Sequence, residues 1–348
     1  MALAEHTGNL LGLNLEELEN FAVSCGQKPY RGRQLYHGIY VRRARDLAGL
    51  TDLNSDFRDA IARHQAIIYP QAERHFCSRD GAVRYLFQLS DGNLVETVYM
   101  PEEDRTTLCL SSQVGCALDC KFCFTALLGS KRNLTAGEII GQVLAVAAGQ
   151  KVARGARLNL VFMGMGEPML NLPQVLKAVS ILADPKGVGV TLRRITVSTV
   201  GIIPRIEGMA LAPVRPKLAI SLNASHDEQR SALMPINKKY PLADLMRVCR
   251  EYPLRSWEHL MFEYVMLEGF NDTDDDARRV ADLLGDMRAK VNLIPYNSGP
   301  EIPFRAPSFE RTLAFQKILM DRRIPTFIRI SRGQDISAAC GQLSLANV

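Results

Sequence analysis

The central motif of the sequence is Cys116-Ala-Leu-Asp-Cys120-Lys-Phe-Cys123, which sets three cysteines in a C-x3-C-x2-C spacing. It follows an apolar segment, 107–111, that we expect to be a β-strand. Three soft thiolates on one tight loop suit zinc or an iron–sulfur cluster. A structural zinc site normally closes with four protein ligands, and no second cysteine pair follows downstream. Three thiolates on a cubane of four irons leave one iron open to chelate a small molecule, so the spacing favours such a cluster over an incomplete zinc knuckle.

Beyond about residue 105, short apolar segments alternate with amphipathic ones. The segments expected as strands are 107–111, 158–163, 194–198, 217–222, 261–266 and 291–295, with 326–330 as an extra one. Helix-start signals lie between them, among them a capping box of Thr135 and Glu138. Strands separated by crossover helices pair in parallel. Six such units are too few for a complete eight-fold barrel, so the sequence predicts an α/β fold with a partial (βα)6 barrel.

The segments before the barrel differ in character. Residues 1 to about 75 read as helical, with helical segments from 31 to about 50 and from 56 to 68. Two strand-like segments, 85–89 and 94–99, flank an Asp91-Gly92 turn and predict a β-hairpin. We therefore expect a small N-terminal helical domain over 1–75, a connecting β-hairpin over 76–101 and the barrel core over 102–348.

Composition excludes several classes of protein. With 348 residues, 47% hydrophobic and 23% charged, the chain is neither disordered nor fibrous. No apolar run approaches the length of a membrane span, and the first residues do not form a signal peptide, so we expect a cytoplasmic protein without a membrane partner. The net charge of +5 permits a nucleic-acid partner without requiring one.

A basic segment near the N-terminus has two interpretations. It carries no acidic residue between Lys28 and Arg45, and Tyr30, Tyr36 and Tyr40 are interleaved with its charges. The segment is either a solvated helix face or a patch that contacts phosphates, with aromatic side chains near it. We expect the second: the N-terminal domain over 1–75 is predicted to bind RNA through its basic residues Lys28, Arg31, Arg33, Arg42, Arg43 and Arg45.

The cysteine loop after the first barrel strand resembles that of the radical S-adenosylmethionine (SAM) superfamily. The wider string from Cys109 to Cys123 is similar to the RlmN family of RNA adenine-C2 methyltransferases, relatives of the Cfr resistance methyltransferases. The resemblance spans about 15–343. Further matching strings are Val95-Glu-Thr-Val, Gly164-Met-Gly-Glu-Pro168, Ser198-Thr-Val-Gly201, Met234-Pro-Ile-Asn-Lys-Lys-Tyr240, Glu263-Tyr-Val-Met-Leu267, Asn292-Leu-Ile-Pro-Tyr-Asn297 and Ala338-Ala-Cys-Gly-Gln-Leu343.

The resemblance implies three groups of site residues. Cys116, Cys120 and Cys123 would hold one [4Fe–4S] cluster. Cys340, in a mobile catalytic loop at the C-terminal end of the core, would carry a methyl group, with Cys109 as its resolving partner in a transient disulfide and Glu96 as proton acceptor. The implied SAM contacts are Gly166, Glu167, Ser198, Ser221, Leu222, Asn223 and Asn297.

Two positions depart from the family pattern. Asn223 stands where the family usually has His, and Phe124 where it often has a small residue. Asparagine can still donate a hydrogen bond to a ribose or a carboxylate. We therefore expect an altered contact at Asn223 rather than lost SAM binding.

The implied activity is methylation of carbon 2 of an adenosine. The family's substrates are position 2503 of 23S rRNA and, often, position 37 of certain tRNAs. Two SAM molecules would be used per turnover, one to methylate Cys340 and one to form the radical that activates this methyl group. Flavodoxin with its reductase is the expected electron donor, and a monomer is expected. The alternatives are a Cfr-like C8 methyltransferase and a non-catalytic, zinc-stabilised RNA-binding protein.

Overall fold

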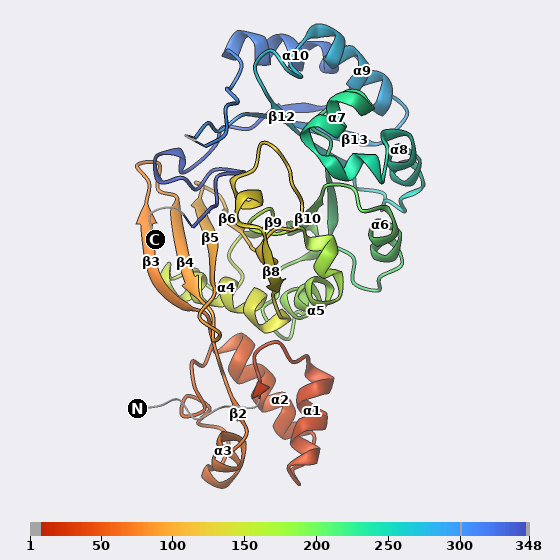
Figure 1. The fold of residues 1–348 in the computed structure, drawn as a ribbon. Helices are drawn as coiled ribbons and strands as arrows, with labels where there is room; N and C mark the ends of the chain where they lie inside the picture. Colours follow the sequence, from red (N-terminus) through yellow and green to blue (C-terminus); the bar gives the residue numbers. More distant parts are fainter. Residues whose placement is uncertain (1–7, 300, 346–348) are drawn as a thin grey trace.

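A ten-stranded mixed sheet forms the centre of the chain in the computed structural model, which describes residues 8–299 and 301–345. Its strand order is β14-β13-β12-β11-β10-β9-β6-β5-β4-β3, and every pair from β6 to β14 is parallel. These parallel strands are β6 (Thr106–Cys109), β9 (Leu158–Phe162), β10 (Ile195–Thr199), β11 (Lys217–Ser221), β12 (Leu260–Met266), β13 (Ala289–Pro295) and β14 (Thr326–Ile328). The predicted partial barrel is confirmed (Figure 1).

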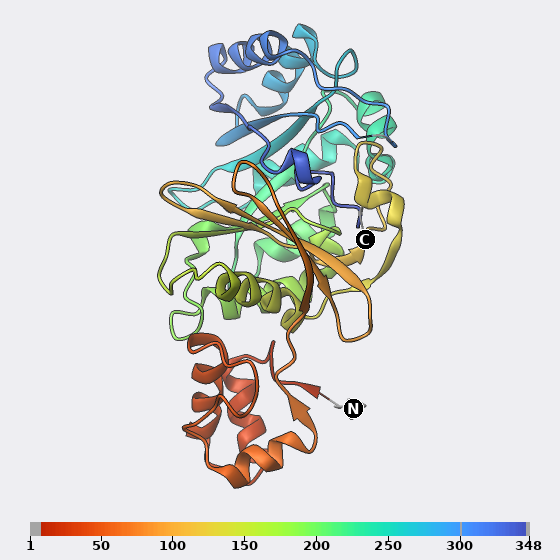
Figure 2. The ribbon, with the colours of Figure 1, turned by 90° about the vertical axis from the view of Figure 1, so that its left-hand side faces the viewer.

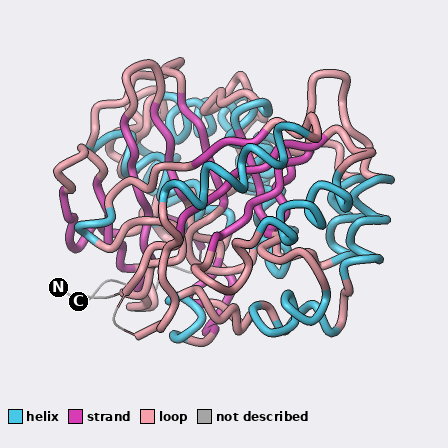
Figure 3. The backbone as a smooth tube through the Cα atoms, turned by 90° about the horizontal axis from the view of Figure 1, so that it is seen from above, coloured by secondary structure: helices cyan, strands magenta, loops and turns pink. Residues whose placement is uncertain are grey.

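The crossover helices flank the strands, as the view from above shows (Figure 3). The predicted capping box before α4 is present, since Thr135 accepts from Glu138 N–H and the Glu138 side chain accepts from Thr135 N–H. The helices of the core are α4 (Ala136–Gly149), α5 (Leu172–Ala183), α6 (Ile203–Ala210), α7 (Asp227–Leu233), α8 (Leu242–Glu251), α9 (Asp274–Leu284) and α10 (Phe309–Asp321). Short helical turns are η2 (Phe124–Leu128), η3 (Pro168–Asn171), η4 (Leu192–Arg194), η5 (Pro235–Lys238) and η6 (Gln334–Ile336).

The predicted hairpin is part of a larger antiparallel extension of the sheet (Figure 2). Strands β4 (Val83–Gln88) and β5 (Leu94–Pro101) form the hairpin, and β5 pairs with β6. A further strand, β3 (Gln71–Cys77), pairs with β4. The expectation of helix up to about residue 75 is therefore wrong at its end. The mostly exposed polar side chains of β3 lack the apolar alternation that marks a strand in a sequence.

The N-terminal part lies below the barrel (Figures 1 and 2). The predicted helical segment from residue 31 ends at Val41, in a π-helical turn, and not near residue 50. The part consists of α1 (Leu15–Ser24), α2 (Tyr30–Tyr36), η1 (His37–Val41), α3 (Ser55–Ala62) and the short parallel strands β1 (Gly8–Asn9) and β2 (Gln65–Ala66).

Two polar contacts join the N-terminal part to α5 and to the residue that follows this helix. Glu17 forms an ion pair with Lys177 at 2.7 Å, and the Tyr36 hydroxyl donates to the Asp184 carboxylate at 2.7 Å. Among the residues that the structure describes, no helix is long and apolar enough to cross a membrane.

Candidate active site

One cavity lies at the carboxyl ends of the parallel strands, the edge at which α/β barrels place their active sites. It gathers side chains that are far apart in the sequence, from the cysteine loop to the loop that carries Cys340. Of the expected SAM contacts, Leu222 does not line it, because its side chain is fully buried in the apolar core. The expected residues that do line the cavity are Cys116, Cys120, Cys123, Gly166, Glu167, Ser198, Ser221, Asn223, Asn297 and Cys340.

The cysteine loop is folded by backbone hydrogen bonds. Cys123 N–H donates to Cys120 O at 3.1 Å, and Cys116 N–H donates to Gly129 O at 2.8 Å. Just outside the loop, Phe124 N–H donates to Gly341 O at 2.8 Å, which ties the cysteine loop to the residue after Cys340. Phe124 packs in a small apolar cluster that includes Tyr296 and Ile302. The fold therefore accommodates the large side chain at this position, where the family often has a small residue.

The donor set suits a multi-iron cluster. All three cysteine side chains face one cavity, yet in 8–299 and 301–345 no three His, Cys, Asp or Glu side chains converge closely enough to hold a single metal ion. A [4Fe–4S] cluster takes each thiolate on a different iron, so it accepts a wider triangle of sulfur atoms than one zinc ion does. Burial raises the pKa of Cys116 to about 11, and ligation would require these thiols to release their protons.

Gly166 and Glu167 form the turn after β9. Gly166 has a φ of +94°, and a Cβ atom built on it would lie 2.5 Å from the Gln113 Cβ. The Glu167 carboxylate accepts from Met169 N–H and Val200 N–H, both at 3.0 Å. Burial raises the pKa of this carboxyl to about 7, although its hydrogen bonds act in the opposite direction. A carboxylate has about four lone-pair sites, so Glu167 can still accept from an ammonium group in the cavity.

Replacing Gly166 by alanine is expected to abolish SAM binding and to destabilise the fold. The positive φ costs roughly 1–2 kcal/mol for a residue with a Cβ, and the overlap with Gln113 adds about 1–3 kcal/mol. The matched control is Gly92→Ala, at φ +80° with nothing within 4 Å of the added Cβ. Equilibrium SAM binding and urea unfolding measure both effects. A Gly166→Ala protein that binds SAM like the parent contradicts the placement.

Asn223 also stands at the cavity, with a φ of +57°. Asparagine and histidine are both enriched in this left-handed conformation, so the departure from the family's usual His keeps the backbone geometry. The Asn223 Oδ1 accepts from Val265 N–H at 2.9 Å, and Asn223 O accepts from the Asn271 side chain at 2.8 Å. The Asn223 side chain therefore lines the cavity and also accepts a hydrogen bond from the protein backbone.

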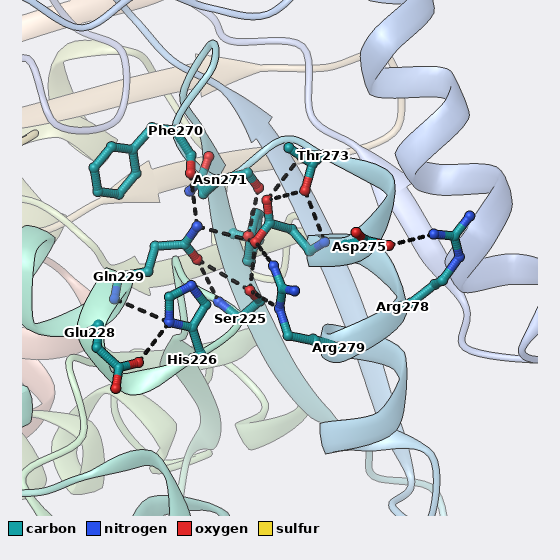
Figure 4. A network of polar contacts seen from close by, with 12 residues as sticks. Ser225, His226, Glu228, Gln229, Phe270, Asn271, Thr273, Asp275, Arg278 and Arg279 are labelled. Atoms are coloured by element: carbon teal, nitrogen blue, oxygen red, sulfur yellow. Dashed lines mark hydrogen bonds and ion pairs between the residues drawn. The ribbon is translucent and has the colours of Figure 1, made fainter.

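A buried polar network holds the loop that carries Asn223 (Figure 4). Its centre is the Asp276 carboxylate of α9, which accepts from Ser225 at 2.6 Å, from Thr273 at 2.6 Å and from Arg279 at 2.7 Å. Burial acts to raise the pKa of Asp276, but these hydrogen bonds hold it below the usual range. Through the bond from Gln229 to Asp276, the network also joins α7 to α9.

Cys340 and Cys109, the expected methyl carrier and its resolving partner, are electrostatic neighbours, although only Cys340 lines the cavity. Cys340 is accessible and lines the cavity, and Asn297 Nδ2 donates to its carbonyl at 3.1 Å. The surrounding protein still excludes enough water to raise the pKa of the Cys340 thiol to about 11, and the Glu263 carboxyl adds to this effect. Cys109, at the end of β6, is buried, and burial and the nearby Cys340 raise its pKa further above the usual range.

Glu263 is a cavity residue that the sequence reasoning did not select. It lies on β12, is 7% exposed and accepts from Asn292 Nδ2 at 2.9 Å. Burial raises the pKa of its carboxyl to about 7, against the effects of Asn292 and Arg329. A carboxyl inside the apolar string Glu263-Tyr-Val-Met-Leu267 was the available signal, since buried acids are rare without a partner or a function.

Glu96, the expected proton acceptor, lies outside the cavity lining. It is 1% exposed and forms an ion pair with Arg84 at 2.6 Å. Its other carboxylate oxygen accepts from Leu345 N–H at 3.3 Å, so it contacts the segment that follows Cys340. Burial raises the pKa of Glu96, although Arg84 and the backbone donors oppose this.

The basic N-terminal residues differ in their contacts. Arg33 pairs with Glu19, and Arg42 with Asp52. Arg31 donates to Gln34, Arg45 lies over the Tyr69 ring, Arg43 Nη1 donates to Val152 O in the barrel, and Lys28 is exposed.

The tyrosines interleaved with these charges are largely structural. Tyr36 and Tyr40 are buried at 3% and 1% exposure, and the Tyr40 hydroxyl donates to Leu13 O at 2.7 Å. A buried ring is not available to stack on a base, so the sequence's aromatic patch is reduced to Tyr30, which is 41% exposed.

Known proteins resemble this chain along nearly its whole length. A family model described as the radical SAM superfamily matches 110–284, and one described as the ribosomal RNA large subunit methyltransferase N-terminal domain matches 8–67. The crystal structure of a radical SAM methyltransferase from Sphaerobacter thermophilus has a TM-score of 0.92 and 44% identity, covering 96% of this chain and 98% of that one.

Relatives that are similar in sequence along most of the chain are also named as methyltransferases. A probable dual-specificity RNA methyltransferase RlmN of Koribacter versatilis is 53% identical over 335 residues, which cover 91% of this chain and 96% of the relative. The dual-specificity RNA methyltransferase RlmN of Geobacter sulfurreducens is 46% identical, over 96% of this chain and 91% of the relative. The chain therefore belongs to the RlmN family of radical SAM dual-specificity RNA methyltransferases.

Proposed function

We propose that the chain methylates carbon 2 of adenosine at position 2503 of 23S rRNA and position 37 of tRNA, with Cys340 as the methyl carrier and Cys109 as the resolving thiol. The observation that carries this proposal is the position of Cys340, which lines the same cavity as Cys116, Cys120 and Cys123 and has Cys109 as an electrostatic neighbour. A cysteine in an RNA methyltransferase cavity, beside a second cysteine, suits covalent relay of a methyl group better than direct transfer.

Carbon 2 of adenine is electrophilic, so it does not attack the methyl group of SAM. A thiolate does, and Cys340 would accept the methyl by displacement. The raised pKa of its thiol means that a base must take the proton first. Glu263 suits this step, because its carboxyl lines the cavity and its pKa of about 7 leaves it partly ionised at neutral pH.

The radical SAM family implies a [4Fe–4S] cluster and SAM, and this chain's residues fit both. Cys116, Cys120 and Cys123 would hold the cluster, which when bound supplies the one-electron chemistry that makes a carbon radical from SAM. Glu167 would accept from the ammonium group of SAM. The other proposed contacts of SAM are Gly166, Ser198, Ser221, Asn223 and Asn297, which all line the cavity.

The remaining steps fall to the two thiols and a carboxylate. The methyl group on Cys340 would give one hydrogen atom to the carbon radical made from SAM, and the resulting methylene carbon would add to carbon 2 of adenine, leaving protein and RNA joined. The joined species would return one electron to the cluster and lose the ring proton. Cys109 would then attack the Cys340 sulfur as a thiolate and form a disulfide, while the electron pair of the broken carbon–sulfur bond stays on the methylene carbon, which takes up a proton to become the new methyl group. Glu96 is the proposed acceptor of the ring proton; its contact with Leu345 connects it to the Cys340 loop.

Several finer points rest on the family alone. The Gly164-Met-Gly-Glu-Pro168 turn and the Cys116-Ala-Leu-Asp-Cys120 loop follow the C2 enzymes rather than the Cfr type. Two SAM molecules per turnover, flavodoxin with its reductase as electron donor, a monomeric enzyme and a cytoplasmic location remain predictions.

Nucleoside analysis tests the proposed product. The 23S rRNA and tRNA pools of a strain lacking this enzyme are isolated separately, before and after complementation, digested and separated beside 2-methyladenosine and 8-methyladenosine standards. We expect 2-methyladenosine to return in both pools with the parent gene. A dominant 8-methyladenosine peak contradicts C2 chemistry, and a return in rRNA alone contradicts the tRNA substrate.

A further inference from the structure

We propose that a cluster of arginines at the base of the barrel is a second RNA site, which binds backbone phosphates away from the methylation cavity. We call it the arginine pocket. This proposal rests on the part of the proposed function that makes RNA the substrate, and it holds whichever carbon of adenosine is methylated. The residues of the arginine pocket are Arg43, Arg105, Arg154, Arg157, Arg193 and Arg194.

Two adjacent cavities make up the pocket. The first lies between Arg43, the loop from α4 to β9 and the loop from α5 to β10. The second shares Arg157, Thr191 and Arg194 with the first and adds Arg105 and Arg193. No Asp or Glu lines either cavity. Two connected basic cavities suit successive phosphates of a chain better than a single anion.

Most of this charge has no carboxylate partner within the described part of the chain. Among residues 8–299 and 301–345, Arg105 alone of the six is in an ion pair, with Glu102 at 2.6 Å. Arg43 donates to Val152 O at 2.9 Å, and Arg154 donates to Pro185 O at 2.9 Å. Bonds to carbonyl oxygens fix a guanidinium in place and leave its positive charge intact. Arg157 is exposed, and Arg194 is partly exposed.

The surroundings of Arg43 disfavour its positive charge. Burial, and to a lesser extent the nearby Arg154, lower the pKa of the Arg43 guanidinium, while Tyr69 acts against them. Arg43 also has a φ of +58°, uncommon for a residue with a side chain. Like charges brought together without acids are stabilised when an anion binds between them.

The chemistry of the pocket matches the RNA backbone. A guanidinium offers a planar fork of donors that fits phosphate oxygens bidentately. Contacts of this kind position a nucleic acid without reading its sequence. The pocket lies at the amino ends of β9 and β10, and the methylation cavity at their carboxyl ends. Five-residue strands span about 17 Å, so a folded RNA is large enough to reach both.

The test compares two variants with the same net charge. Arg157→Gln/Arg194→Gln removes the two arginines shared by both cavities. The control, Arg63→Gln/Arg205→Gln, removes two exposed arginines that lie outside the pocket and have no ion pair in the described residues. Binding of a transcribed substrate RNA is measured over a series of salt concentrations, with inorganic phosphate titrated separately.

The pocket variant is expected to bind RNA at least about tenfold more weakly, with a salt slope smaller by roughly one to two. Iron content and SAM binding should equal those of the parent, and the control should keep the parent's RNA affinity. Equal losses in both variants would reduce the effect to net charge and overturn the site. Unchanged RNA affinity overturns it too, including when the pocket variant loses only the binding of inorganic phosphate.

Discussion

Replacing Cys120 by alanine is expected to remove the iron and abolish SAM cleavage. The same holds for Cys116 and Cys123, because three thiolates are the fewest that hold a four-iron cluster with one iron left for substrate. All three side chains line the cavity that also contains the proposed SAM contacts. Iron and sulfide content after anaerobic reconstitution, absorbance near 400 nm and release of cleaved SAM measure the outcome.

A matched control shows whether the loss of iron is specific to the three loop cysteines or follows from removing a cysteine elsewhere. Cys77 is exposed on β3, outside the cavity lining, so Cys77→Ala should keep iron, colour and activity. A Cys120→Ala protein that still holds four irons after reconstitution contradicts the ligand assignment. A colourless parent protein that holds one zinc ion would instead favour the non-catalytic, zinc-stabilised RNA-binding protein.

The second large effect is expected from replacing Cys109, the buried thiol proposed to release the product from Cys340. With Cys109→Ala we expect RNA to stay covalently attached to the protein, because the attack that releases the product is lost while the earlier steps remain. Cys340→Ala should give neither an adduct nor methylated RNA. Denaturing gels of protein isolated from cells, with and without nuclease treatment, show the adduct. A Cys109→Ala protein that is free of RNA and still turns over contradicts the resolving role.

The barrel was predictable because its signals are local. Apolar strands, crossover helices and caps such as Thr135 with Glu138 specify each unit by itself, and the parallel order follows from the crossovers. Strand β3 was missed because its side chains are mostly exposed and polar. Its pairing comes from β4, an interaction that no pattern within Gln71–Cys77 expresses.

The cavity was predictable in part. Residues near the carboxyl ends of the strands, such as Ser198 and Glu167, line one cavity because parallel strands all end at the same edge of the sheet. Glu263 was missed because an acid inside an apolar strand shows its function only when its neighbours are known. Leu222 matched a family position, but its side chain lies in the core.

The basic segment shows a different limit of sequence reasoning. Charge counting grouped Arg33, Arg42 and Arg43 together, but their contacts in the fold differ. The first two pair with Glu19 and Asp52, whereas Arg43 faces the barrel beside Arg154. The acids that pair with Arg33 and Arg42 lie 14 and 10 positions away, whereas the Arg43 partner Val152 lies 109 positions away. Only the folded chain shows which of these charges has an acidic partner.

The most direct test of the proposed chemistry follows the methyl group of Cys340. Protein made in cells fed methionine with a deuterated methyl group is isolated, and mass analysis of the Cys340 peptide should show a deuterated methyl on that residue. The protein is then incubated with RNA and unlabelled SAM for a single turnover. We predict that the first 2-methyladenosine formed carries deuterium, because its carbon comes from Cys340. An unlabelled product, or an unmodified Cys340 peptide, would contradict the covalent route.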